Sequence, residues 1–188
     1  MQFKISNISV SLLVFLLVAG FGLPTWSTAA TAKEIDVSVG VALDRFFQEV
    51  EGARELTGQA KGLLVMPGVI KAGLVVGGQY GEGALLIDGK TVDYYNLIAG
   101  SYGLQVGAQK TDIIIAFMTD AALEQFRISQ GWEAGVDGNI ALVDTGMGRR
   151  VDTTTLRDPV VGFVFGVKGL MADLSLKGAK FTRTDKSR

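Results

Sequence analysis

The middle of the chain, residues 63–118, alternates long apolar runs with short polar interruptions. The runs are rich in valine, isoleucine and glycine, and the β-branched residues favour strands over helices. Two of the runs share a short glycine motif, Gly-Gln-Tyr-Gly at 78–81 and Gly-Ser-Tyr-Gly at 100–103. Because glycine inside a strand has no side chain to pack, its repeated use predicts sharp bends or close approach of neighbouring backbones. We therefore expect a strongly bent β-sheet core.

The polar interruptions divide this region, and the chain beyond it, into further elements. We predict strands at 61–66, 69–87, 91–98, 101–108 and 113–118, separated by turns at 67–68, 88–90 and 110–112. The segment 113–118 is apolar at every position, which predicts burial on both faces. Further along we predict a strand at 132–144 with a possible bulge at Gly135, a long loop at 144–156, and a hairpin at 160–176 bent around Lys168.

Residues 35–59 show the apolar period of a helix instead. Val39, Leu43, Phe46 and Val50 recur at steps of three and four and share one face. The opposite face is mainly acidic, whereas helices that lie on membrane surfaces usually carry a basic polar face. We therefore interpret this segment as a helix packed on the sheet. A second, short helix is predicted to follow an N-cap at 119–120 and to end near 129.

These elements together predict a fold of the α+β class. We expect a single domain built on a strongly bent, mostly antiparallel β-sheet, either barrel-like or a sandwich. An N-terminal amphipathic helix and a short second helix complete it.

The first 32 residues have the three-part layout of a secretory signal peptide. Lys4 precedes an apolar run at 8–23, and small residues follow up to Ala30-Thr31-Ala32. We expect cleavage before Lys33, so that 1–32 is the signal peptide and 33–188 the domain. The alternative is an uncleaved membrane anchor, although the run is shorter than the roughly 20 residues that a span needs. The expected location is the periplasm or the cell envelope. A lipoprotein is not expected, because the chain has no cysteine.

Composition narrows the chemistry. The 188 residues include neither cysteine nor histidine, which excludes thiol catalysis, Ser-His-Asp triads and the commonest metal ligands. The formal net charge of −1 gives no case for nucleic acid. The glycines of the two glycine motifs are not spaced as in nucleotide-binding loops. Asp137-Gly138-Asn139 lacks a full set of calcium ligands. We expect no catalytic residues, metal or cofactor. An enzyme that uses carboxylates alone is a distant alternative, and Glu82 is the acidic residue nearest a glycine motif.

Four lysines are candidate lipid-binding residues: Lys71, Lys168, Lys177 and Lys180. They precede or follow apolar segments at predicted bends, or lie in the basic C-terminal segment. Gathered at one end of the sheet, they would form a patch for anionic headgroups, each contributing about 1 kcal/mol near such a surface. The alternative is that they only keep turns solvated.

Five motifs of the chain resemble the SYLF domain, and the match extends over about 35–182. They are AKGLLVMPGVIKAGLVVGGQYGEGALL, YYNLIAGSYGLQVGAQ, IIIAFMTDAALEQF, GWEAGVDGNIAL and VKGLMADLSLKGAKF. The resemblance implies a lipid-binding domain with no known catalysis, whose eukaryotic members also bind actin. Lys71 and Lys168 fall where the family motif carries lysine. The residues that match the glycine motifs of the family are Tyr80, Gly81, Gly83, Gly103, Gln105 and Gln109.

The sequence therefore predicts non-catalytic binding of phospholipid or a related amphiphile at a bacterial cell envelope. The expected partner is an anionic phospholipid or a membrane surface. The alternative is a structural or scaffolding envelope protein that binds an unknown protein partner or itself.

Overall fold

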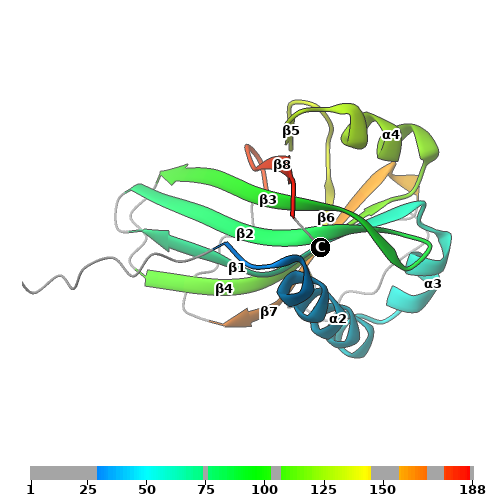
Figure 1. The fold of residues 1–188 in the computed structure, drawn as a ribbon, viewed down its shortest axis with the longest axis horizontal. Helices are drawn as coiled ribbons and strands as arrows, with labels where there is room; N and C mark the ends of the chain where they lie inside the picture. The colour runs from blue at the N-terminus through cyan, green and yellow to red at the C-terminus, as the bar shows by residue number, and fades with distance from the viewer. Residues whose placement is uncertain (1–28, 74–75, 103–106, 145–156, 169–175, 187–188) are drawn as a thin grey trace, which may run out of the picture.

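We describe residues 29–73, 76–102, 107–144, 157–168 and 176–186 of a computed structural model of the chain (Figure 1). The helices in these ranges are α2 (Ala32–Glu49), α3 (Ala53–Gln59) and α4 (Asp120–Ile128). The strands are β1 (Gly62–Gly73), β2 (Val76–Ile87), β3 (Lys90–Tyr102), β4 (Gly107–Phe117), β5 (Trp132–Glu133), β6 (Ala141–Asp144), β7 (Val160–Lys168) and β8 (Lys180–Thr184).

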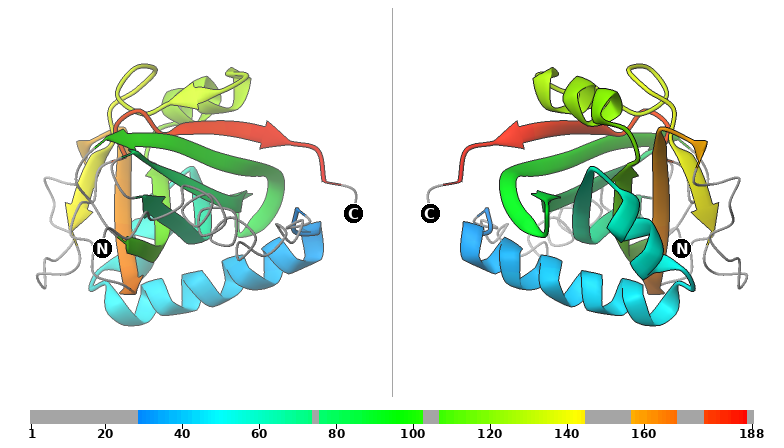
Figure 2. Two further views of the ribbon diagram at one scale, coloured as in Figure 1. Left: turned by 90° about the vertical axis from the view of Figure 1, so that its left-hand side faces the viewer. Right: turned by 90° about the vertical axis from the view of Figure 1, so that its right-hand side faces the viewer.

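The eight strands form one curled sheet in the order β5-β8-β3-β2-β1-β4-β7-β6. All neighbours pair antiparallel except β6 and β7, which are parallel. The sheet curls into a half-barrel, with α2 across one face and α4 on the other (Figure 2). The predicted α+β class and strongly bent, mostly antiparallel sheet are confirmed. We call the two sides of the sheet the α2 face and the α4 face.

Each face carries its own hydrophobic core. On the α4 face, Phe126 is fully buried among aromatic rings, with centroid distances of 4.8 Å to Tyr95 and 4.7 Å to Phe117. On the α2 face, Phe46 packs edge-on against Phe163 at 5.0 Å. Residues 113–117 of β4 alternate between these two cores and are all buried, as predicted. Met118, the last residue of the predicted segment, follows the strand and is only partly buried.

The predicted helix at 35–59 is two helices. α2 begins one turn earlier than expected, because Thr31 and Glu34 form a capping box in which each side chain binds the other's backbone N–H. α2 ends at Glu49, and Gly52 then adopts φ +83°, a left-handed conformation that only glycine takes without cost. The chain turns there, so that Leu56 of α3 also reaches the core of the α2 face.

Strands β1, β3 and β4 are longer than predicted, because residues assigned to turns lie within them. Pro67-Gly68 does not end β1 but forms a bulge: Met66 pairs with Ile113 of β4, and Val69 pairs with Thr111. Gly68 has φ +59°, and its N–H donates to Oδ1 of Asp112 at 2.8 Å. The predicted turn at 110–112 likewise lies inside β4, and β3 continues through 99–100. Pairing with neighbours on both sides satisfies these backbones, so polar residues there do not need a turn.

The predicted strand at 132–144 is two short strands on opposite edges of the sheet. β5 pairs with β8, the chain turns at Gly135 with φ +87°, and β6 pairs with β7. The first half of the predicted hairpin is β7. The bend and the second half of that hairpin lie mostly outside the described residues, as does the predicted loop at 144–156. Gly103 and Gln105 lie outside them entirely.

Candidate functional site

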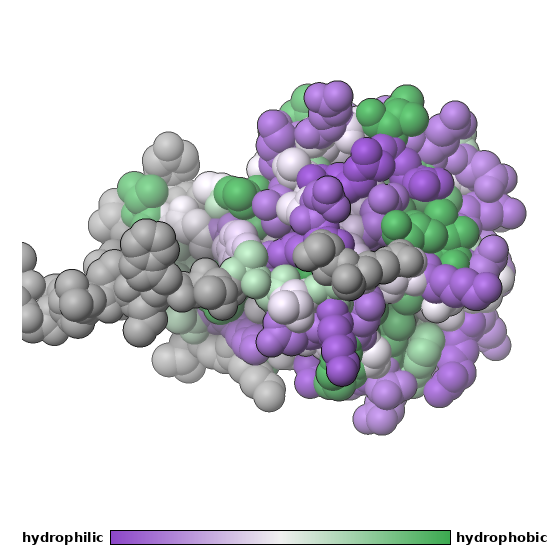
Figure 3. Space-filling model, in the orientation of Figure 1, coloured by the Kyte–Doolittle hydropathy of each residue, from purple (hydrophilic) through white to green (hydrophobic). Residues whose placement is uncertain are grey.

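A row of directly paired residues crosses the sheet where it extends beyond α2. The successive pairs are Lys180 with Ile98, Ile98 with Tyr80, Tyr80 with Ile70, Ile70 with Lys110, and Lys110 with Lys168. We call these six residues the transverse row. Directly opposite residues point to the same face of a sheet, and Ile98, Tyr80, Ile70 and Lys110 point here to the α2 face. The three central side chains, Ile98, Tyr80 and Ile70, are 55%, 48% and 51% exposed. In Figure 3, hydrophobic residues lie among polar ones on the part of the molecule that projects to the left of α2.

A cleft of about 300 Å³ lies beside this row, in the angle between α2 and the sheet. Its wall on α2 includes Val37 and Val41, two large apolar side chains that are more than half exposed. Its floor is formed by the β1 bulge, with Lys110 and Asp112 of β4. Lys110 belongs to both the cleft and the transverse row. The cleft and the exposed apolar residues of the row therefore form one continuous surface.

The charges in the cleft are unequally matched. Arg45 of α2 forms an ion pair with Asp112, whose second carboxylate oxygen accepts the N–H of Gly68. Asp112 is thus satisfied on both oxygens. Lys110 has no ion-pair partner among the described residues, and its alkyl chain lies over Gly68, where an added Cβ would be 2.5 Å from Cε. Among the residues that line the cleft, two are basic and one is acidic, so the lining carries a net charge of +1; the carboxylate of Glu49, which accepts the N–H of Gly166, lies at its edge.

The structure separates the four lysines predicted from the sequence. Lys168 and Lys180 lie in the transverse row but at opposite ends, five strand spacings apart, or roughly 24 Å along the sheet. Lys71 is only 6% exposed and lies within β1, not at a bend, opposite Gln79 and Gln109 on the α4 face. Lys177 is exposed in the turn before β8. The four lysines therefore do not form one patch, and their binding of lipid stays a prediction.

The sequence interpretation missed the residues that the structure does bring together. Lys110 was assigned to a turn, so it was not considered as part of a sheet surface. Val37 and Val41 lie one helical turn apart and outside the core-facing stripe of α2. That spacing was the available signal, since two large apolar residues sharing an otherwise polar side of a helix mark a second surface.

Glu82, the candidate acid of the enzyme alternative, is engaged in structural contacts. Its Oε2 accepts the N–H of Ala30 at 2.9 Å, and its Oε1 accepts Nζ of Lys186 at 2.7 Å. Burial by itself raises the pKa of Glu82, but the hydrogen bonds from Lys186 and Ala30 outweigh it and leave that pKa lowered. Burial, with the charge of Glu82 as a smaller cause, raises the pKa of Tyr80. Glu82 thus holds the start and the end of the described chain on β2.

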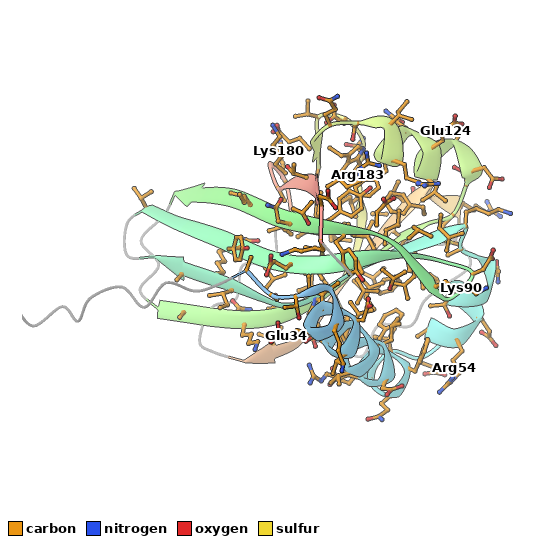
Figure 4. The ribbon with its side chains drawn as sticks, in the orientation of Figure 1. Glu34, Arg54, Lys90, Glu124, Lys180 and Arg183 are labelled. Atoms are coloured by element: carbon orange, nitrogen blue, oxygen red, sulfur yellow. The ribbon has the colours of Figure 1, made fainter. Side chains whose placement is uncertain are left out.

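A second cleft, of about 490 Å³, lies between α4 and β8 and has two arginines in its wall. Arg127 and Arg183 lie 3.6 Å and 3.7 Å from the carboxylate oxygens of Asp93 (Arg183 is labelled in Figure 4). Burial, assisted by the charge of Asp93, raises the pKa of the nearby Tyr95 to about 12. Because both arginines contact Asp93, and Asp120 and Glu124 also line the wall, this cleft offers a weaker site for an anion than the cleft at Lys110.

The described residues offer neither a metal site nor a membrane-spanning helix. They contain no group of three or more acidic side chains that could hold a metal ion. No helix within them is long and apolar enough to cross a membrane.

The candidate site is thus an open cleft that contains Lys110 and is continuous with exposed apolar side chains. A family model described as "Ysc84: Las17-binding protein actin regulator" matches residues 98–187. This match supports the assignment of the chain to the SYLF-domain family, which its motifs predicted. The family is linked to lipid and actin-related binding. No curated protein sequence matches the chain significantly.

Proposed function

We propose that this domain binds anionic phospholipid at the surface of a bacterial envelope membrane, without catalysis. The observation that carries the proposal is Lys110, which has no ion-pair partner among the described residues and belongs both to the cleft and to the transverse row, beside Ile70. A phosphate headgroup is a suitable partner for that charge, and the lipid interface is a suitable environment for the apolar side chains around it.

The two parts of the surface would act together. A basic residue near an anionic membrane contributes about 1 kcal/mol, which by itself gives only weak attachment. Val37, Val41 and Ile70 add aliphatic surface that is now in water, and Tyr80 adds an aromatic ring of the kind that settles at headgroup level. Glu34, at the other end of α2, repels anionic lipid. We therefore place the headgroup at the Lys110 end of the cleft.

The absence of catalysis is part of the same proposal. It is supported by the engagement of the two buried or half-buried carboxylates nearest this surface. Asp112 is bound by Arg45 and Gly68, and Glu82 by Ala30 and Lys186.

Binding of a protein partner, or of a second copy, is the alternative function. The specific observation in its favour is the same row of exposed Ile98, Tyr80 and Ile70, because unpartnered apolar patches also mark protein interfaces. The description of the matched family likewise names a protein partner for that family.

Liposome co-sedimentation tests the proposal on protein recovered from the periplasm of an expressing bacterium. We expect binding to vesicles containing phosphatidylglycerol and little binding to pure phosphatidylcholine, with a decrease as salt rises. Lys110→Glu should reduce binding several-fold. Lys90→Glu, at the β2–β3 turn away from the extended end (Figure 4), is the matched control and should bind as wild type does.

A second pair of variants tests the apolar contribution. Ile70→Ser should weaken binding, whereas Ile128→Ser, which changes an exposed isoleucine on α4, should not. Equal binding by Lys110→Glu, Ile70→Ser and wild type would refute this surface. Absence of binding to any vesicle, together with a concentration-dependent dimer in size-exclusion chromatography, would favour the protein-partner alternative.

A further inference from the structure

Contacts within the described residues begin before Lys33, the predicted start of the mature chain. Ala30, three residues upstream of Lys33, has both of its backbone polar groups bound. Its N–H donates to Oε2 of Glu82, and its carbonyl accepts Nζ of Lys186 at 3.0 Å. The side chains of Glu82 and Lys186 are only 14% and 11% exposed. Figure 2 shows the end of the described chain, just after β8, beside the start of α2.

The next two residues belong to α2. Thr31 is its N-cap, and the Thr31 hydroxyl accepts the N–H of Glu34 while the Glu34 carboxylate accepts the N–H of Thr31. Ala32 is the first helical residue and is buried in the core of the α2 face. Ala29, in contrast, is exposed. Among the described residues, the contacts of the fold therefore extend back to Ala30.

The sequence offers a signal peptidase three positions with small residues at the required spacing. Cleavage can follow Ala29, Ala30 or Ala32, with Ser27, Thr28 or Ala30 two residues before the cut residue. Sequence alone does not separate these sites.

The fold does separate them. A chain starting at Lys33 lacks the N-cap and the first residue of α2. It also places an ammonium in the first helical turn, where the helix dipole opposes positive charge. A chain starting at Thr31 puts the ammonium on the N-cap itself and leaves Oε2 of Glu82 without the donor that Ala30 supplies. Only a start at Ala30 keeps every contact and puts the new charge against a carboxylate.

We propose that the signal peptide is removed between Ala29 and Ala30, and that the ammonium so formed pairs with Glu82. A peptidase of the export pathway hydrolyses this peptide bond with one water molecule. Ala29 leaves as a carboxylate and Ala30 gains a protonated amine. Lys186 on one oxygen of Glu82 and the ammonium on the other then join both ends of the mature chain to β2. This proposal depends on the chain having a signal peptide and is independent of lipid binding.

Intact-mass spectrometry of the exported full-length gene product gives the first test. We expect a mature chain that begins at Ala30. A start at Thr31 or Lys33, or an uncut chain, would overturn the proposal. Ala29→Phe, which puts a large residue at the cleaved position, should abolish the Ala30 start. Ala32→Leu, which blocks only the alternative site, should leave that start unchanged.

The reactivity of the terminal amine gives the second test. An ammonium paired with a carboxylate releases its proton less readily than the ordinary α-amino group, whose pKa is about 8. Labelling at pH 7 with an amine-reactive ester should be several-fold slower at Ala30 in wild type than in Glu82→Gln. Lys90, exposed and distant, should react equally in both proteins and serves as the internal control. Equal reactivity of Ala30 in the two proteins would show that the pair does not form.

Discussion

Gly83 of β2 is the position where we expect the smallest substitution to have the largest effect. A Cβ added there would lie 2.0 Å from the carbonyl oxygen of Val65 and 2.9 Å from the Cα of Met66, both in the backbone of β1. Side chains that meet flexible neighbours can be accommodated by rotation. Backbone atoms of a paired strand cannot move without disturbing the ladder next to the bulge at Pro67-Gly68.

The distances give the size of the effect. An ordinary contact begins near 3.4 Å, so Gly83→Ala would force β1 and β2 apart by roughly 1 Å or more. Overpacking usually costs about 1–3 kcal/mol, and a fixed backbone puts this case at the upper end or beyond. We expect a loss of about 3 kcal/mol, which for a domain of this size lowers Tm by roughly 6–12 °C.

Gly100 of β3 is the matched control, because a Cβ added there meets nothing within 4 Å. Gly100→Ala should leave stability unchanged or raise it by about 0.4–1 kcal/mol through the lower entropy of the unfolded chain. Thermal unfolding followed by circular dichroism measures both variants. If Gly83→Ala and Gly100→Ala melt within 2 °C of each other, close backbone approach does not explain the glycine in this motif.

Three further predictions concern other parts of the fold. Phe126→Ala should cost about 3–5 kcal/mol in urea unfolding, because its ring is fully buried, while Ile128→Ala on the exposed side of α4 should change little. Gly52→Ala should destabilise by about 1–2 kcal/mol, because φ +83° suits only glycine, and Gly58→Ala inside α3 should stabilise by about 0.5–1 kcal/mol. Since the pKa of Glu82 is lowered from 4.5, its carboxylate stabilises the fold at neutral pH and loses this effect as pH falls below that value. The Tm difference between wild type and Glu82→Gln should therefore shrink from pH 6 to roughly pH 3, and a constant difference would count against the ion pair.

Local patterns in the sequence determined the class of the fold. The uninterrupted apolar run at 113–118 predicted burial on both faces, and for 113–117 the structure supplies a core on each. Thr119 was identified as an N-cap, and its hydroxyl accepts the N–H of Ala122 at the start of α4. Such signals are readable because capping and burial depend on residues close together in the chain.

The ends of the strands were decided by pairing across the sheet. Proline followed by glycine has the same composition in a turn and in a bulge, so Pro67-Gly68 did not reveal that β1 continues to Gly73. What keeps the strand extended is its neighbours. β4 pairs with residues before and after the bulge, and Asp112 binds the N–H of Gly68.

The same bulge decided which residues face outward, and hence the composition of the candidate site. Side chains alternate along a regular strand, so Lys71 would share the α2 face with Val65, and Ile70 would point into the core with Met66. The extra residue at the bulge reverses this order, which leaves Ile70 exposed beside Lys110 and Lys71 buried on the α4 face. The sequence by itself determined that the chain builds a bent, glycine-rich sheet and that its motifs resemble the SYLF domain. Only the tertiary structure decided which lysine meets the solvent, because side-chain parity depends on a register set by a partner strand more than 40 residues away.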